Sequence, residues 1–489
     1  MISDPIVMKR LVQFFSVIIF GMLPLHSQNV DIQDANFLYA LIELGVDTNN
    51  DSLISFTEAE AVTNLNVNDE NISDMTGIEA FVNLNELYCD YNQLTSLDVS
   101  GCTALTGLDC YANQLTSLDV SGCKALTGLY CYDNQLTSLD ISNNTALLRF
   151  LCYANLLTSL DVSGCKALLD FDCGGNHLTS LDVSNNQDLT WLWCSKNQLT
   201  SLDVSNNTAL LRIYCSGNQL TSLDISNNQD LTKLRCDNNQ LTSLDISNNQ
   251  DLTELVCGNN QLTSLDVSNN TALLFFSCGG NQLTSLDVSG CTALTGLDCY
   301  DNQLTSLDVS GCTALTGLNC YGNQLTSLYV SNNQDLTVLS CDNNQLISLD
   351  VSKNTVLEYL YITDMPTLYE VCVWKLPFPP ANLYVETEGS PNICFDTICN
   401  GTCDGTGIDE EATTRISIYP NPANNLLAIE TEQSGPHSIE ISSLNGQLIF
   451  SATTDGDTYR IDMSPFSKGV YFITVRTRDF VVTRKIVRY

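Results

Sequence analysis

Cysteine thiols are the most regularly spaced reactive groups in this chain. Between Cys89 and Cys341 a cysteine recurs at every twenty-first residue, thirteen times in all, and an asparagine follows each one three residues later, from Asn92 to Asn344. Thiols can bind metals or form disulfides. Cysteines stacked in register on strands ~4.8 Å apart keep their Cβ atoms farther apart than a disulfide normally allows. We therefore expect this cysteine ladder to pack as small, inert hydrophobic side chains.

Four further cysteines lie beyond the periodic segment, in an irregular and proline-rich stretch. In a secreted chain, cysteines in such a stretch tend to pair, so one or two disulfides are expected among them. The spacing of the last two lacks a second ligand pair of the kind that zinc sites use, which argues against a metal. The four are Cys372, Cys394, Cys399 and Cys403.

Carboxylates form a second ladder in the periodic segment. Asp98 recurs with the same period, and only Tyr329 interrupts the series. Carboxylates ~4.8 Å apart repel by about 1 kcal/mol in water and by about 3.5 kcal/mol at an effective dielectric constant of about 20. Serines at the positions of Ser96 and Ser100 can relieve the repulsion by donating hydrogen bonds. We expect a solvated face screened by salt; diffuse binding of divalent cations is the alternative.

A third set of oxygen ligands lies near the start of the chain. Between residues 47 and 58, side-chain oxygens fall at the first, third, fifth, ninth and twelfth positions, and the seventh offers its carbonyl. This is the spacing of an EF-hand-type calcium loop, although Ser52 replaces the usual glycine at the sixth position. A structural Ca2+ site is expected, with a polar turn before a short helix (57–63) as the alternative. The ligands would be Asp47, Asn49, Asp51, Leu53, Ser55 and Glu58.

The 21-residue period indicates the elements that position these groups. A period this short is too small for two helices, so each repeat forms one coil of a solenoid that shares a continuous core with its neighbours. One unit, from Leu105 to Leu126, reads LTGLDCYANQLTSLDVSGCKAL. Its first half is expected to form a strand, and its second half a short strand or an extended segment.

The pattern LxxLxCxxNxL in this unit resembles the leucine-rich repeat, with cysteine in place of the second strand aliphatic. Nested halves of ten and eleven residues resemble the short bacterial class of these repeats, from about Leu65 to Leu360. The resemblance implies a mainly β solenoid with parallel strands and a concave strand face. An atypical unit precedes the regular ones, and its apolar residues fit an N-terminal capping repeat: Ile72, Met75, Ile78 and Phe81.

The two ends of the chain indicate where it goes. Residues 1–27 combine Lys9 and Arg10 with an apolar run too short to span a membrane, as in a signal peptide. The last 75 residues abandon the period and alternate as seven short strands, which predicts a small β-sandwich.

This tail resembles the C-terminal sorting domain of the type IX secretion system of Bacteroidetes. The motifs that carry the resemblance are Tyr419-Pro-Asn-Pro422, Asn445-Gly-Gln447 and Gly469-Val-Tyr-Phe472. The resemblance implies contact with the secretion machinery, passage through the outer membrane, removal of the tail, and attachment to the cell surface or release.

These patterns divide the chain into five parts. We expect a signal peptide over 1–27, a helical N-terminal cap with the calcium loop over 28–64, and the leucine-rich repeat solenoid over 65–362. A Cys- and Pro-rich C-terminal cap and linker follows over 363–414, and the sorting domain occupies 415–489. The mature chain has no predicted transmembrane helix.

Charge and histidine content exclude several functions. The formal charge is −37, so nucleic acid is excluded as a partner. Only His177 and His437 remain after the leader, which argues against a histidine-based catalytic triad or a histidine-ligated zinc. The repeated aspartates offer no distinguished pair for acid–base catalysis. We therefore expect a protein that is not an enzyme.

Differences between the repeats are concentrated at the outward positions of the first strand. The second half is almost invariant, whereas the central coils join aromatic side chains to several of the few cations, a composition typical of binding hot spots. Aromatics that merely cover their sheet neighbours are the alternative. The predicted ligand-binding residues are Trp191, Trp193, Arg212, Tyr214, Lys233, Arg235, Tyr130 and Tyr132.

Together these features favour a non-enzymatic binding protein at the cell surface, an adhesin or ligand-recognition solenoid. Its ligand is a protein or a glycan, and the sequence does not choose between them. A structural spacer or a cation-binding surface element is the alternative, because near-identical cassettes such as SGCTALTGL recur. A hydrolase acting on polymers is the least favoured function.

Overall fold

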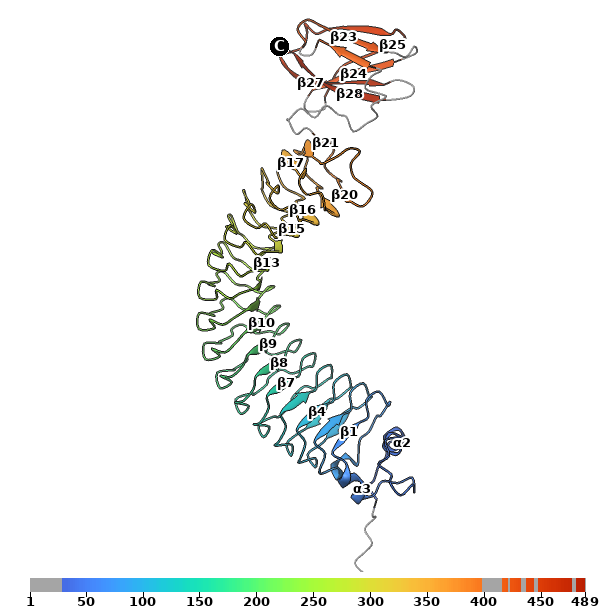
Figure 1. Ribbon diagram of the computed structural model, residues 1–489, viewed down its shortest axis with the longest axis vertical. Helices are drawn as coiled ribbons and strands as arrows, with labels where there is room; N and C mark the ends of the chain where they lie inside the picture. Colours follow the sequence, from blue (N-terminus) through green and yellow to red (C-terminus); the bar gives the residue numbers. More distant parts are fainter. Residues whose placement is uncertain are drawn as a thin grey trace, which may run out of the picture. The chain divides into compact units, whose positions relative to one another are not determined.

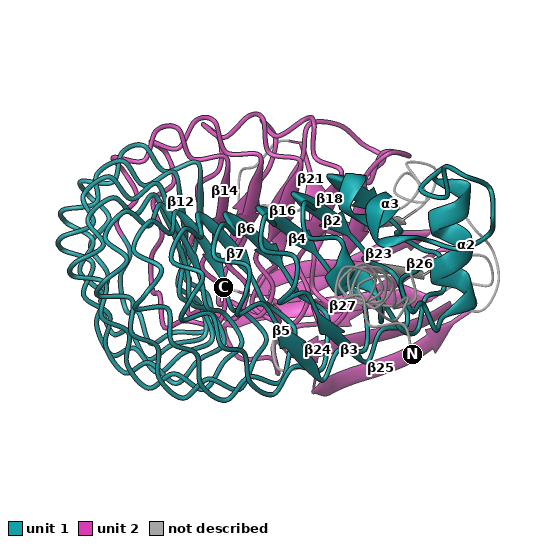
Figure 2. Cartoon of the chain, turned by 90° about the horizontal axis from the view of Figure 1, so that it is seen from below, with its two compact units in different colours: residues 1–286 teal, residues 287–489 magenta. Residues whose placement is uncertain are grey.

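A computed structural model describes residues 29–397, 416–420, 423–431, 437–443, 447–476 and 481–488. The chain divides into two compact units, residues 1–286 and 287–489, which Figure 2 colours separately. Within the described ranges no helix has the length and apolarity needed to cross a membrane. The predicted leader, residues 1–27, lies outside them.

Two short helices form the N-terminal cap, as predicted. Helix α2 spans Ala35–Glu43, and the Asp34 side chain caps its start by accepting from two backbone N–H groups. Helix α3 spans Phe56–Ala61 and begins with a reciprocal cap between Ser55 and Glu58. The four residues of the predicted capping repeat are also buried in the core: Ile72, Met75, Ile78 and Phe81.

The main sheet of the first unit contains one three-residue strand per coil, and these strands lie side by side in Figure 1. Neighbours are parallel and in register, so that Leu192 pairs with Ile213 one coil further on. The parallel solenoid is therefore confirmed. In order, the strands are β1 (Asn64–Asn66), β2 (Glu86–Tyr88), β4 (Gly107–Asp109), β6 (Gly128–Tyr130), β7 (Arg149–Leu151), β8 (Asp170–Asp172), β9 (Trp191–Trp193), β10 (Arg212–Tyr214), β11 (Lys233–Arg235), β12 (Glu254–Val256) and β13 (Phe275–Ser277).

Each strand of this sheet buries its central residue, and most of the flanking residues are at least partly exposed, because successive side chains point to opposite faces. The cysteine that follows the strand turns back inside, as Cys194 does, and is fully buried. The eighteen cysteines between Cys89 and Cys341, which include five in the second half-repeats, are buried and form no disulfide. Desolvation raises the pKa of ladder thiols such as Cys194 and Cys215, for Cys215 to about 12.

The asparagine of each coil connects the backbones of neighbouring turns. Asn197 Oδ1 accepts a hydrogen bond from the N–H of Leu178 at 3.0 Å. Its Nδ2 donates to the carbonyls of Cys173 and Cys194, at 3.0 and 3.1 Å. One side chain thus satisfies buried polar groups of two successive coils, which explains why the residue never varies.

The second half of each repeat is mostly extended. In the first coils, strands β3 (Ser96–Asp98) and β5 (Ser117–Asp119) pair with each other. In the described coils between residues 138 and 266, the second half of the repeat contains no strand. A small buried side chain donates to the preceding coil: Cys123 Sγ donates to Val99 O at 3.1 Å, and Asn207 Nδ2 to Val183 O at 2.9 Å. The exchange of cysteine and asparagine at this position therefore preserves a donor.

The second unit continues with parallel strands. One ladder contains β14 (Gly296–Asp298), β15 (Gly317–Asn319), β16 (Val338–Ser340), β18 (Tyr359–Tyr361) and β20 (Tyr384–Glu386), and another contains β17 (Ser348–Asp350), β19 (Glu370–Cys372) and β21 (Cys394–Asp396). Parallel pairing therefore extends past residue 362, into the segment expected to be an irregular cap. Cys372 and Cys394 are disulfide-bonded, whereas Cys399 and Cys403 lie outside the described residues.

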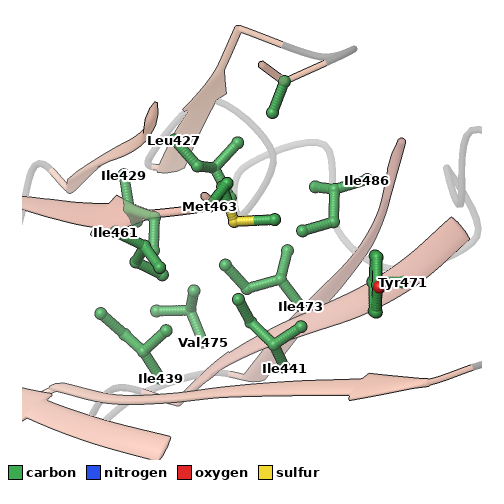
Figure 3. Packing of buried hydrophobic residues seen from close by; sticks show 11 residues of the cluster. Leu427, Ile429, Ile439, Ile441, Ile461, Met463, Tyr471, Ile473, Val475 and Ile486 are labelled. Atoms are coloured by element: carbon green, nitrogen blue, oxygen red, sulfur yellow. The ribbon is translucent and has the colours of Figure 1, made fainter. Parts of the chain in front are cut away.

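The C-terminal tail forms two antiparallel sheets, and all seven predicted strands are present. The sheets enclose a core of aliphatic side chains that Figure 3 shows at close range, among them Leu427, Ile441 and Ile473. The first sheet contains β22 (Ile416–Tyr419), β23 (Leu426–Thr431) and β26 (Thr458–Asp462), and the second β24 (His437–Ser443), β25 (Leu448–Thr454), β27 (Gly469–Arg476) and β28 (Val481–Arg488).

Candidate functional site

The outward side chains of the main sheet form three rows, which we call the strand face. The rows are the first strand position, the third strand position, and the residue directly after the ladder cysteine. Because the strands are in register, residues of one row lie one coil apart at every twenty-first position. The predicted ligand-binding residues all lie on this face, and six of them lie on the three consecutive strands β9, β10 and β11.

Trp191 and Arg212 form the first contact of this group. The Arg212 guanidinium carbon lies 4.1 Å from the centroid of the Trp191 ring, which is a cation–π arrangement. Trp191 remains 45% exposed. One part of the indole is therefore covered by an arginine while the rest faces solvent.

Trp193 and Tyr214 form the second contact, in the neighbouring row. Their rings meet edge to face, with centroids 4.9 Å apart and an interplanar angle of 88°. Arg235 continues the series, with its guanidinium carbon 5.4 Å from the Tyr214 ring. Trp193 is 46% exposed. The two tryptophans therefore present large apolar surfaces at the centre of a ring of polar and cationic groups, an arrangement typical of binding hot spots.

Glu254 on β12 holds the side chains of Lys233 and Arg235 in place. It was not among the predicted ligand-binding residues. Its carboxylate pairs with Lys233 at 3.0 Å and also with Arg235. Burial is the largest influence and opposes ionisation, but the hydrogen bonds and charges of the two partners hold the pKa of Glu254 below its usual value. Glu254 lies one period after Lys233, in the same row of the strand face, and this spacing could have identified it from the sequence. We call these seven residues, Trp191, Trp193, Arg212, Tyr214, Lys233, Arg235 and Glu254, the aromatic–cation patch.

The structure does not bring Tyr130 and Tyr132 into this patch. Their strand, β6, is separated from β9 by β7 and β8 in the sheet order. Tyr132 lies in a separate stack, with ring centroids 4.3 Å from both Tyr111 and Tyr153. Tyr130 lies in another row, and its hydroxyl helps to raise the pKa of Arg149 through a hydrogen bond.

The two histidines beyond the predicted leader lie in different units of the chain. His177 is exposed in a turn of the solenoid, while His437 is buried in the tail, with Nε2 3.1 Å from Thr431 Oγ1. Neither residue lies on the strand face. The strand face therefore has no histidine to act as a base within its described coils.

Two of the six predicted calcium ligands, Asp47 and Glu58, are buried, whereas Asn49, Asp51 and Leu53 are exposed. Asp47 accepts from the N–H groups of Asp51 and Ser52, and Glu58 accepts from Thr48 and Ser55. These hydrogen bonds, led by the one from the Ser55 backbone, lower the pKa of Glu58 to about 2. Asp47 and Glu58 are both 8% exposed.

The backbone of this loop fits the expected turn. Asn50 and Ser52 have φ of 60° and 64°, so Ser52 adopts the left-handed conformation for which glycine is usual at this position. Across the residues described, no three acidic, histidine or cysteine side chains converge as a ready metal site. The oxygens of Glu58 would therefore have to exchange their Thr48 and Ser55 donors for an ion.

Hydrogen bonds from serine relieve the repulsion in the aspartate ladder. Asp140 Oδ1 accepts from the Ser142 N–H at 2.9 Å, and the same contact recurs at Asp161 and Asp182. The serine hydroxyls and N–H groups hold the pKa of these aspartates below 3.8. The predicted role of the serine after each aspartate is therefore confirmed, and the carboxylates remain exposed.

Comparison with known proteins agrees with both parts of the fold. Residues 417–488 match the family model described as "Secretion system C-terminal sorting domain". No protein with a curated description matches the chain.

Solved structures of leucine-rich proteins resemble this chain over different shares of its length. The functional domain of InlJ from Listeria monocytogenes, described as including a cysteine ladder, is 27% identical, covers 94% of this chain and 99% of its own, and has a TM-score of 0.60. An internalin, inlF, of the same species is 22% identical, covering 72% and 94% with a TM-score of 0.48. The leucine-rich effector YopM from Yersinia pestis is 20% identical, covering 79% and 99% with a TM-score of 0.45.

These findings establish the general nature of the chain. It is a leucine-rich repeat solenoid followed by a type IX secretion sorting domain. A sorting domain of this kind directs transport across the outer membrane, so the protein reaches the cell surface or the medium.

Proposed function

We propose that this secreted solenoid is a non-enzymatic recognition protein of the cell surface and that the aromatic–cation patch binds its ligand. One observation carries the proposal: Trp191 and Trp193 lie on one strand, each about half exposed, and are held by Arg212 and Tyr214 from the next strand. Large aromatic side chains exposed to this extent gain most by being covered by a partner.

The patch suits two kinds of ligand. Tryptophan faces can stack against sugar rings, and arginine and lysine can pair with the carboxylates of an acidic glycan or an acidic protein. Arg235 and Lys233 share the single carboxylate of Glu254. Their remaining donors are therefore available to an anionic group of the ligand.

Two other functions have less support. A hydrolase needs a pair of groups with separate acid and base roles, and the patch contains one carboxylate, which is paired with two cations. A structural spacer fits the uniform aspartate and serine face. It does not explain why aromatic and cationic side chains gather on adjacent strands in a chain with few cations.

The test uses the full chain on glycan arrays and in pull-down experiments with surface proteins. Trp193→Ala and Arg212→Ala are each expected to lower the affinity for the ligand by tenfold or more, about 1.4 kcal/mol. Tyr329→Asp is the matched control, because Tyr329 is a 74% exposed aromatic residue in the aspartate ladder. Unchanged binding by both patch variants would place the site elsewhere, and absence of any ligand would favour the spacer.

We also propose a structural role for Ca2+ in the loop of residues 47–58. The left-handed conformation of Ser52 and the inward Asp47 and Glu58 support it. The ligands would be Asp47, Asn49, Asp51, Ser55 and Glu58, with the carbonyl of Leu53. A bound ion would join α2 to α3 and stiffen the cap.

Calorimetry on the full chain tests this role. Calcium is expected to bind once with measurable heat and to raise the melting temperature, and Asp47→Ala should abolish both effects. Asp140→Ala in the exposed ladder is the matched control. If calcium raises the melting temperature equally in both variants, the ion binds diffusely to the aspartate face instead.

A further inference from the structure

Three carboxylates gather on the strand face at the N-terminal end of the sheet, away from the aromatic–cation patch. Glu86 is the first residue of β2, Asp90 follows the cysteine after β2, and Asp109 is the last residue of β4. In the parallel register Asp109 lies between Tyr88 and Tyr130. We call these five residues, together with Tyr111, the acid–tyrosine cluster.

Asp90 is the most unusual member of the cluster. Its side chain is only 3% exposed, and Oδ1 is buried without a hydrogen-bond partner in the described structure. The Asp90 backbone is satisfied, because its N–H donates to Asn68 Oδ1 at 3.2 Å. A buried carboxylate oxygen that lacks a donor is costly. Tyr111 donates a hydrogen bond to the Asp90 side chain, so Oδ1 alone is without a donor among the described residues.

The charges around Asp109 are all of one sign. Burial, followed by the charges of Asp90 and Glu86, raises the pKa of Asp109 to about 6. Arg149, two strands further along, is hydrogen-bonded to Tyr130 of the cluster and also pairs with Asp170, at 3.1 Å, on the strand beyond. At neutral pH the cluster therefore carries negative charge without a matching cation among the groups that act on Asp109.

Two glycines leave space above the sheet for this arrangement. A Cβ atom on Gly107 would overlap the Glu86 carboxylate, which therefore lies across the glycine and beside Asp109. A Cβ atom on Gly128 would lie 3.1 Å from Cε2 of the Tyr130 ring. Glycine at both positions thus allows an acidic and an aromatic side chain to lie flat on the sheet.

We propose that the acid–tyrosine cluster binds a lysine or arginine side chain of a partner protein. Carboxylates supply charge-assisted hydrogen bonds to such a cation, and tyrosine faces add cation–π attraction. A long basic side chain would lie against the tyrosine rings, beside the carboxylates of Glu86 and Asp109. A bare metal ion fits less well, because the described acidic side chains do not converge as a metal site. The site does not depend on the aromatic–cation patch.

The experiment measures binding of an oligolysine peptide to the full chain, with the same peptide acetylated on every lysine Nε as the uncharged control. The Asp90→Asn, Asp109→Asn double variant should weaken oligolysine binding about tenfold or more. The matched control is Asp119→Asn, Asp140→Asn, which removes the same charge from the exposed ladder and should weaken binding less than about twofold.

Three outcomes would overturn the proposal. Equal losses in the two double variants would mean that the peptide binds the diffuse negative field. Unchanged binding in both would mean that the cluster is not used. Full competition by saturating Ca2+, with no difference between the charged and acetylated peptides, would make the cluster a cation site instead. Glu86→Gln, expected to weaken binding in the same direction, replaces the double variant if that variant does not fold.

Discussion

Arg212 lies over the Trp191 ring at 4.1 Å, and the two residues come from adjacent strands one repeat apart. The contact is possible because the repeat places both residues in the same row of the strand face. It holds the guanidinium at the surface without burying it. Residues of the patch are therefore positioned by the solenoid but contribute little to its stability, which separates binding from folding in the variants below.

The first prediction concerns this separation. Arg212→Ala should lower the free energy of unfolding by less than about 1 kcal/mol, because an exposed cation–π pair contributes no more than that. The same variant should lose ligand affinity as described above. Chemical denaturation together with the binding assay provides the check. A large loss of stability would mean that Arg212 is part of the structural framework.

The second prediction compares the two asparagine columns. Asn197 uses both its oxygen and its nitrogen on buried backbone groups, so Asn197→Ala should cost about 3 kcal/mol or more. Asn207 donates through Nδ2, whereas its Oδ1 is buried without a partner in the described structure. Replacing Asn206 and Asn207 by Gly and Cys, as in the natural cassette Ser-Gly-Cys, should change stability by less than about 1 kcal/mol.

Urea unfolding midpoints of the two variants test this difference. Asparagine already occupies position 206, and a Cβ on Gly164, which also follows a Ser-Asn-Asn coil, would lie 3.4 Å from the carbonyl of Ser142, an ordinary contact. A single Asn207→Cys variant, with Asn206 kept, is the informative control and should be about as stable as the double replacement. Equal losses for the two columns would contradict the assignment of their hydrogen bonds.

The third prediction concerns thiol reactivity. The ladder thiols are buried and desolvation raises their pKa, for Cys257 to about 12, so the reactive thiolate is scarce at neutral pH. Ellman's reagent should label few of them in the native chain and all of them in denaturant. Cys372 and Cys394 should be protected until a reductant is added, because both are disulfide-bonded. Fast native labelling of Cys194 would show that the ladder opens.

The fourth prediction is a stability maximum at mildly acidic pH. Burial raises the pKa of Asp109 and of Asp172 to about 6, so the folded state takes up protons before the unfolded state does as the pH falls. The free energy of unfolding should therefore increase as the pH falls from about 7 to about 5. Below about pH 4 it should fall, because the pKa of Glu58 is lowered to about 2 and those of the aspartate ladder are also lowered.

Melting temperatures across this pH range provide the measurement. In an Asp109→Asn, Asp172→Asn variant the rise toward about pH 5 should be smaller, while the loss at lower pH should remain. Glu58→Gln should instead reduce stability at neutral pH and reduce its dependence on acid. A stability that increases steadily up to pH 7 in the parent chain would contradict the raised pKa values of the two aspartates.

Much of the architecture followed from the sequence alone. A strict 21-residue period allows only one coil per repeat, so the parallel ladder, the buried cysteines and the asparagine hydrogen bonds were predictable from Cys89 and Asn92 onward. The tail strands were predictable for the same kind of reason, because alternation between core and solvent leaves a two-residue pattern. Local pattern and tertiary burial coincide in both parts.

Only the tertiary structure decided which outward residues act together. Glu254 joins Lys233 and Arg235 because the register sets its carboxylate between two cations, while Tyr130 lies apart from the tryptophans it was grouped with. The unpartnered oxygen of Asp90 could not be predicted either, because the sequence does not distinguish a buried aspartate from an exposed one. Repetition determines the backbone, because every coil meets the same neighbours. Side-chain chemistry on the face depends on contacts between different coils, which no single repeat contains.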